Sequence, residues 1–266
     1  MLVRKAYTFT IFVQNEFVQL ILEITQQNIA AFQLAGNEIQ LLEKAACTKR
    51  TDAGYKEVLT QVIEKIGNLD RFENFSCSYF GQEFCLVPNS LFAASDPETL
   101  LQYSVHKNIS KSDVDYNRLP EWSSVIVYRL PMWVKSVLIL KAPRIVIQHE
   151  LSHVLRYLTT ASLIPLRSHL VIHEEQFSLV VRKEGNIVHT SIQEYQNEDD
   201  IVYHLATVFT QLQIETKNEL FVHGTGDAVE NIQQKLETQL KRIKLFEPVK
   251  IEIQTSNHLQ FQTLCV

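Results

Sequence analysis

Two stretches of the chain, about 148 residues apart, carry the same succession of short apolar runs and tight turns. Short β-prone runs joined by tight polar turns are typical of an antiparallel β-meander. The runs are residues 18–24, 29–34 and 38–42 in the first stretch, and residues 169–173, 177–181 and 187–192 in the second. Shifting the first stretch by this offset brings Leu22 onto Leu170 and Ile24 onto Ile172. The sequence therefore predicts the same meander twice.

A helix is predicted after each meander. In the first half, Asp52 is placed to cap a helix with an apolar stripe at helical spacing, and Gly67 ends it. In the second half, Asn197 caps a helix whose first turn is acidic, which favours its N-terminus. The other predicted strands are 75–80, 83–87, 125–130, 220–223 and 249–253; the other predicted helices are 96–105 (with a capping box from Ser95 to Glu98), 132–140, 145–158 and 229–243; residues 104–122 are predicted as a loop.

Strands and helices alternate after each meander, which predicts an α/β fold built from two similar units. A chain of 266 residues suits two domains or one large one. We expect the first unit to span residues 1–160 and the second to span residues 161–266. With 45% hydrophobic and 21% charged residues, the composition excludes a disordered chain, a collagen and a coiled-coil rod.

The net charge of the chain limits the classes of partner that it can bind. Lys and Arg number 25 against 30 Asp and Glu, which gives a net charge of -5. Binding to nucleic acid phosphates or to anionic lipid needs a basic excess, which this chain lacks. We therefore expect no nucleic acid partner.

Targeting signals and paired cysteines are not evident in the sequence. Gln14, Asn15 and Glu16 interrupt the first apolar stretch, and no apolar run reaches the 18 residues of a membrane span. The cysteines show no Cys-x-x-Cys spacing, which indicates reduced thiols; Cys77 and Cys85 approaching across a hairpin is the alternative. We expect a cytoplasmic protein without a membrane span. The four cysteines are Cys47, Cys77, Cys85 and Cys265.

The twofold plan of meander, helix, strand and helix resembles the actin-like ATPase superfamily. Its members include actin, sugar kinases and the cytoplasmic actin-like protein of type IV pilus assembly. The hairpin at residues 183–186 is similar to the phosphate hairpin of that superfamily's second half, and the strand ending in Gly224, Thr225 and Gly226 resembles its adenosine motif. More narrowly, residues 197–212 look like a bacterial family of unknown function grouped with this superfamily. The resemblance implies two actin-like, ribonuclease H-like units.

The phosphate loops depart from the superfamily's pattern. Its loops resemble Asp-x-Gly, in which the aspartate orients metal and water and the glycine lets backbone amides approach phosphate. The equivalents here, residues 23–28 and 172–176, have no glycine, and the second presents Glu174 and Glu175 to an anion. We therefore expect no cofactor and no ATP hydrolysis. The expected function is a non-catalytic actin-like module that binds an unidentified protein. Alternatively, Gly224, Thr225 and Gly226 still hold ATP with Mg²⁺, or form only a tight turn.

The sequence also contains one H-E-x-x-H motif, which resembles the minimal zinc-peptidase signature. On a helix, His149 and His153 share one face and can bind zinc, with Glu150 as general base. A zinc metallopeptidase is therefore a further alternative. Arg156 lies on the same face, and the third-ligand window at residues 173–175 has strand patterning, so we expect no metal there. The imidazoles are expected to face water, and replacing them is expected to cost little stability.

The remaining histidines show no further ligand spacing. A single histidine is more often a surface residue or a hydrogen-bonded core residue than a ligand. These residues are His106, His169, His189, His204, His223 and His258.

Overall fold

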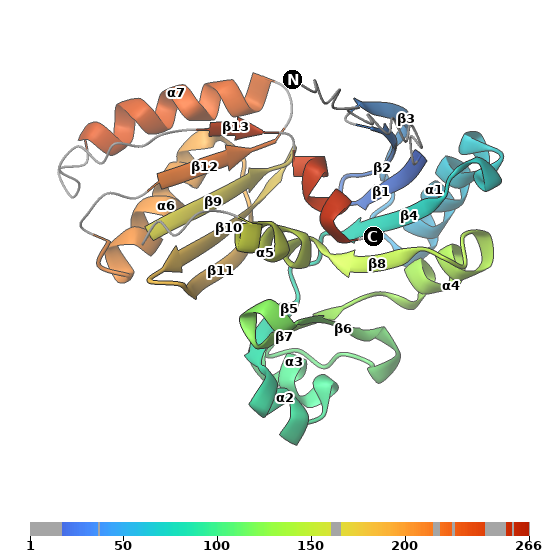
Figure 1. Cartoon of the computed structure of the whole chain (residues 1–266), viewed down its shortest axis with the longest axis horizontal. Helices are drawn as coiled ribbons and strands as arrows, with labels where there is room; N and C mark the ends of the chain where they lie inside the picture. The colour runs from blue at the N-terminus through green and yellow to red at the C-terminus, as the bar shows by residue number, and fades with distance from the viewer. Residues whose placement is uncertain are drawn as a thin grey trace, which may run out of the picture.

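Two five-stranded sheets with the same strand order lie side by side in the computed structural model (Figure 1). The structure describes residues 18–36, 38–160, 166–214, 219–224, 227–242, 254–256 and 258–265. The first sheet has the order β3-β2-β1-β4-β8 and the second β11-β10-β9-β12-β13. Their strands are β1 (Val18–Ile24), β2 (Asn28–Ala35), β3 (Glu38–Ala46), β4 (Asn74–Tyr79), β8 (Val146–His149), β9 (Leu166–Ile172), β10 (Gln176–Lys183), β11 (Asn186–Glu194), β12 (Glu219–His223) and β13 (Gln254–Ser256).

Each sheet joins an antiparallel meander to parallel strands. In the first meander Ile24 pairs with Ile29, and in the second Ile172 pairs with Phe177. These closing pairs are related by the offset found in the sequence, so both predicted meanders are confirmed. The parallel strands β4 and β12 then pair with β1 and β9 at matching places. Together these features give the predicted actin-like arrangement of two α/β sheets.

The helices that follow the meanders begin at well-formed caps. The first is α1 (Asp52–Ile66), but its N-cap is Thr51, whose hydroxyl accepts a hydrogen bond from the Gly54 amide, rather than Asp52. In the second half, α6 (Glu198–Gln211) has a capping box between Asn197 and Asp200. The remaining helices are α2 (Asn89–Ala94), α3 (Pro97–Val105), α4 (Met132–Lys141), α5 (Glu150–Thr160) and α7 (Asp227–Arg242), with 3-10 helices η1 (Leu69–Arg71), η2 (Lys111–Asp113), η3 (Pro120–Trp122) and η4 (His258–Cys265).

A third, three-stranded sheet corrects the prediction of a loop at residues 104–122. Its order is β5-β7-β6, from β5 (Phe84–Pro88), β6 (Val114–Leu119) and β7 (Ser124–Arg129). The edge strand β6 is polar, and it is held by its antiparallel pairing with β7. Helices α2 and α3 pack on this sheet. The capping box predicted at Ser95 is also wrong, because Asp96 is the N-cap of α3 and its side chain makes no capping hydrogen bond.

The predicted helix at residues 145–158 is a strand followed by a helix. Val146–His149 forms β8, which pairs in parallel with β4, and the helix α5 begins only at Glu150. The apolar side chains of α5 are nevertheless fully buried, as its helical periodicity predicts. They are Leu151, Val154, Leu155 and Leu158.

The C-terminal 3-10 helix η4 lies between the two five-stranded sheets (Figure 1). Although residues 161–266 were expected to form the second unit, Leu259 packs with Ile21 and Leu34 of the first sheet. The predicted strand at residues 249–253 lies outside the described residues. Among the described residues, no helix has both the length and the apolar character needed to cross a membrane.

Candidate functional site

The turns that close the two meanders meet each other. Gln27 Nε2 in the β1–β2 turn donates a hydrogen bond to Glu175 Oε2 in the β9–β10 turn at 3.1 Å. Beside it, Asn28 Nδ2 donates to Glu174 Oε2 at 2.9 Å. These are the turns that the resemblance equates with phosphate loops. Side chains of the protein itself therefore join the two turns across the cleft between the two sheets, which Asn28, His173 and Glu174 line.

Cations of the first unit pair with both glutamates of the second turn. Lys44 on β3 contacts Glu174, and Arg50 Nη2 lies 3.1 Å from Glu175 Oε2. From the sequence, these two carboxylates are expected to repel a phosphate. In the structure, each carboxylate also has a cationic partner. The side chains are half exposed, so each pair contributes about 0–1 kcal/mol.

The backbone amides of the first turn are already hydrogen-bonded. The amides of Gln27 and Asn28 both donate to the Thr25 hydroxyl, at 3.2 and 3.0 Å. A phosphate loop needs such amides free and converging on the anion. Thr25 therefore takes the hydrogen bonds that a phosphate would need.

Glu23, the acidic residue of the first phosphate-loop equivalent, is buried and paired. His258 Nε2 of η4 lies 2.9 Å from Glu23 Oε1. Burial alone would raise the pKa of Glu23, but the charge and hydrogen bond of His258 outweigh it and lower that pKa. In return, although burial lowers the pKa of His258, Glu23 raises it above its ordinary value. The two groups form a buried ion pair at the position that the resemblance equates with the superfamily's aspartate.

A second buried carboxyl–imidazole contact lies beside the first. Glu150 Oε1 accepts a hydrogen bond from Ser178 at 2.9 Å and lies 3.2 Å from His173 Nε2. Burial raises the pKa of Glu150 to about 8, and burial with the nearby His258 charge lowers the pKa of His173 to about 3. Near pH 7 both groups are therefore neutral.

The H-E-x-x-H histidines do not form the expected water-facing pair on one helix. His149 ends β8, and its Nε2 donates to the Gly81 carbonyl at 2.8 Å, so its Nδ1 is the acceptor for the Leu151 amide. His153 lies on α5 and is only 2% exposed. Burial lowers the pKa of His149 to about 4 and that of His153 to about 3. The expectation of exposed imidazoles is wrong because the strand and the helix of this segment both pack into the core.

Arg156 has several polar partners, and its charge adds to burial in lowering the pKa of His153. It contacts Gln148, donates to the Arg118 carbonyl at 2.9 Å and lies 3.5 Å from Glu121.

Within the described ranges, no group of three or more His, Cys, Asp or Glu side chains is arranged to hold a metal.

The proposed adenosine motif is described only in part. Gly224 follows β12 directly and is half-buried. Thr225 and Gly226 lie outside the described residues.

Of the cysteines, Cys47, Cys77 and Cys85 are free thiols.

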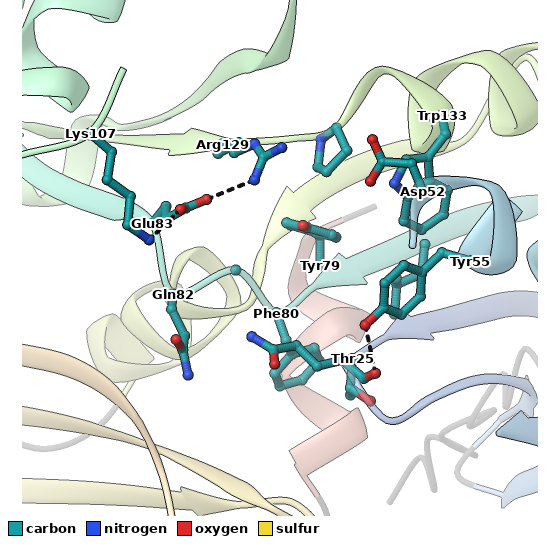
Figure 2. Close-up of a pocket in the computed structure, with 14 residues that line it drawn as sticks. Thr25, Asp52, Tyr55, Tyr79, Phe80, Gln82, Glu83, Lys107, Arg129 and Trp133 are labelled. Carbon is teal, nitrogen blue, oxygen red and sulfur yellow. Dashed lines mark hydrogen bonds and ion pairs between the residues drawn. The ribbon is translucent and has the colours of Figure 1, made fainter. Parts of the chain in front are cut away.

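A cavity of about 260 Å³ opens where the parallel strands β1 and β4 end (Figure 2). On one side, the rings of Tyr55 and Trp133 stack at 5.6 Å. On the other side, Glu83 pairs with Lys107 at 2.8 Å and with Arg129 at 3.2 Å. Burial would raise the pKa of Glu83, but these two cations lower it. The cavity thus combines an aromatic wall with a charged one.

Sequence reasoning missed this cavity because its residues come from distant segments. Tyr55 is on α1, Glu83 follows β4, and Lys107 follows α3. Arg129 is the last residue of β7, and Trp133 is on α4. No spacing in the sequence joins them.

A second cavity, of about 300 Å³, lies beside the joined turns and is lined in part by Glu23, Lys44, Glu174 and His258.

Comparison with known proteins identifies a family and similar folds. Residues 8–243 match the model of a family described as "Protein of unknown function (DUF3822)". A protein of Bacteroides thetaiotaomicron VPI-5482, described as having an actin-like ATPase fold and unknown function, aligns with a TM-score of 0.73 and 15% identity over 97% of this chain and 100% of that one. A chain of the "PilM-PilN type IV pilus biogenesis complex" aligns with a TM-score of 0.52 and 13% identity over 91% and 89%. None of the curated proteins matches the chain.

Proposed function

The chain belongs to the DUF3822 family, and we propose that it is a non-catalytic actin-like module that acts by binding another protein. The observation that carries this proposal is the joining of the two turns. The side chains of Gln27 and Asn28 donate hydrogen bonds to Glu175 and Glu174 across the cleft. The backbone amides of Gln27 and Asn28 donate to the Thr25 hydroxyl. A nucleotide phosphate entering here would have to break these contacts and lie beside two carboxylates.

The cavity of Figure 2 is the proposed place for a partner's segment. Ligands of open α/β sheets bind outside the carboxyl ends of the strands, and aromatic residues and arginine are enriched in protein interfaces. The stacked pair Tyr55–Trp133 and the charged group around Glu83 supply both kinds of contact. The similar PilM–PilN structure is itself a complex of two proteins, so a fold of this kind can hold a protein partner.

The location and the unit boundary belong to the same proposal. We propose the cytoplasm as the location, which the free thiols of Cys47, Cys77 and Cys85 support. We also propose that the chain passes from the first unit to the second near residue 160, after α5.

Site-specific photo-crosslinking in cells tests the proposed interaction. A photoreactive residue replaces Gln82, an exposed residue on the rim of the cavity, and a matched control carries it at Tyr203, which is 75% exposed on α6. The proposal predicts one crosslinked protein from Gln82 only, and its loss when Tyr55→Ala is added. Equal labelling from both positions, or labelling that Tyr55→Ala leaves unchanged, would contradict a partner site at this cavity.

A further inference from the structure

The C-terminal 3-10 helix η4 contacts both five-stranded sheets. Its first residue, His258, pairs with Glu23 of β1 at 2.9 Å, and its ring lies edge-to-face with that of His173 after β9 at 4.8 Å. The Phe261 ring lies 4.6 Å from Tyr157 of α5 and 4.8 Å from His223 of β12. A segment at the end of the chain therefore lies between the two sheets and touches each of them (Figure 1).

On the first sheet, η4 is held by buried polar and apolar contacts together. Leu259 is 1% exposed and packs with Ile21 and Leu34. Gln262 Oε1 accepts from the Ser76 hydroxyl at 2.9 Å, and that hydroxyl accepts from Gln19 Nε2 at 3.0 Å. These contacts are buried, whereas the ion pairs of Lys44 and Arg50 with the second turn are half exposed. Buried contacts contribute more than exposed ion pairs, so η4 contributes more than these ion pairs to holding the two sheets together.

The Glu23–His258 pair links the helix to the cleft energetically. Removing one partner of a buried ion pair leaves the other charge without compensation, which is strongly unfavourable unless water reaches it. If η4 leaves, Glu23 must be hydrated. Water that replaces His258 enters the cavity lined by Glu23, Asn28 and Glu174, next to the two joined turns.

We propose that η4 is a strap that holds the two sheets in their closed arrangement, and that its release opens the cleft at the turns of both meanders. The strap acts in cis and is built from residues 258–265. Its release exposes Glu23 and separates the two turns that Gln27 and Asn28 otherwise join to Glu175 and Glu174. The groups that face His258 are Glu23 from β1, His173 from the end of β9 and Glu150 from α5.

Hydrogen exchange on the full chain, read peptide by peptide by mass spectrometry, tests the strap. Leu259→Asp places a carboxylate in the buried contact with Ile21 and Leu34, and Leu41→Asp is the matched control because Leu41 is 52% exposed on β3. We expect amides of residues 25–28 and 173–176 to exchange at least tenfold faster in Leu259→Asp than in the wild-type chain. Amides of α1 and of the β5-β7-β6 sheet are expected to keep their rates, as is the whole of Leu41→Asp.

The exchange pattern decides between a strap and a local contact. Faster exchange confined to residues 258–265 would overturn the proposal, because the turns would then stay closed without η4. If Leu259→Asp does not fold, the same experiment is done with His258→Asn, which removes the charge and keeps a smaller polar group. Faster exchange at both turns then supports the strap, and faster exchange confined to residues 258–265 overturns it. The double variant Glu23→Gln/His258→Asn, which leaves no buried charge in the pair, is expected to restore slow exchange at both turns.

Discussion

Gln27 and Glu175 occupy equivalent positions in the two meanders and hydrogen-bond to each other across the cleft at 3.1 Å. Their separation of 148 residues is the offset that relates the two halves of the chain. The two meander turns therefore face each other. Here the contact is made by protein side chains.

This contact is expected to be weak by itself. A double-mutant cycle of Gln27→Ala and Glu175→Ala, read by urea denaturation, is predicted to give a coupling energy of about 0.5–1 kcal/mol, because both side chains reach solvent. A coupling above about 2 kcal/mol would mean that the turns, rather than η4, hold the cleft closed.

Because the H-E-x-x-H histidines are buried, replacing them is predicted to cost much more stability than the sequence alone led us to expect. His149→Ala removes a buried hydrogen bond to the Gly81 carbonyl, and His153→Ala leaves a cavity under α5. Each is predicted to lower the free energy of unfolding by about 2–4 kcal/mol. Tyr203→Ala, at an exposed helix position, is the control and is expected to change it by less than about 0.5 kcal/mol. Losses as small as the control's at His149 and His153 would contradict their burial.

Acid is predicted to destabilise the protein through its buried histidines. The pKa of His149 falls to about 4, and those of His153, His173 and His223 to about 3, with burial as the main cause in each. The unfolded chain binds protons near pH 6.5, where the folded chain does not. The free energy of unfolding therefore falls as pH is lowered from about 6.5 towards 4, by up to about 1.4 kcal/mol per pH unit for each histidine. Urea titrations across this range measure the slope, and a flat profile would refute the prediction.

Glu150 contributes the opposite slope between about pH 4.5 and pH 8, and so offsets the contribution of one histidine where the two ranges overlap. Its folded pKa of about 8 lies above the ordinary value of 4.5, so between these values the folded chain holds a proton that the unfolded chain lacks. This contribution to stability is complete below pH 4.5 and is lost as pH rises towards 8. Glu150→Gln keeps a neutral group and is predicted to gain stability relative to the wild-type chain as pH rises from 5 to 8. A difference between the two proteins that does not vary with pH would show that Glu150 is ionised in the fold.

Local patterns in the sequence predicted most of the fold. The meanders were predictable because Ile24 and Ile172 sit at the same point of the same run-and-turn order, and α6 because Asn197 begins a full capping box. The error at residues 145–158 arose because a short buried strand such as β8 has no periodicity of its own when it runs directly into an amphipathic helix.

The site depends on contacts that leave no trace in local sequence. His258 and Glu23 are 235 residues apart, and His258 had no ligand spacing to mark it. The missing glycines of the phosphate loops were visible in the sequence. That Thr25 takes the turn's amides, and that Lys44 and Arg50 pair with the facing glutamates, required the folded arrangement.

A thermal-shift titration with ATP and Mg²⁺ tests the central claim most directly. A ligand at 100 times its dissociation constant stabilises a protein by about 2.7 kcal/mol, which corresponds to a rise in Tm of roughly 5–10 °C for a chain of this size. Because the two turns are joined and the amides of Gln27 and Asn28 in the first turn are occupied, we predict no rise at millimolar ATP. A rise of several degrees that disappears when Gly224 is replaced by a bulky residue would contradict the account and favour a nucleotide-binding actin-like protein.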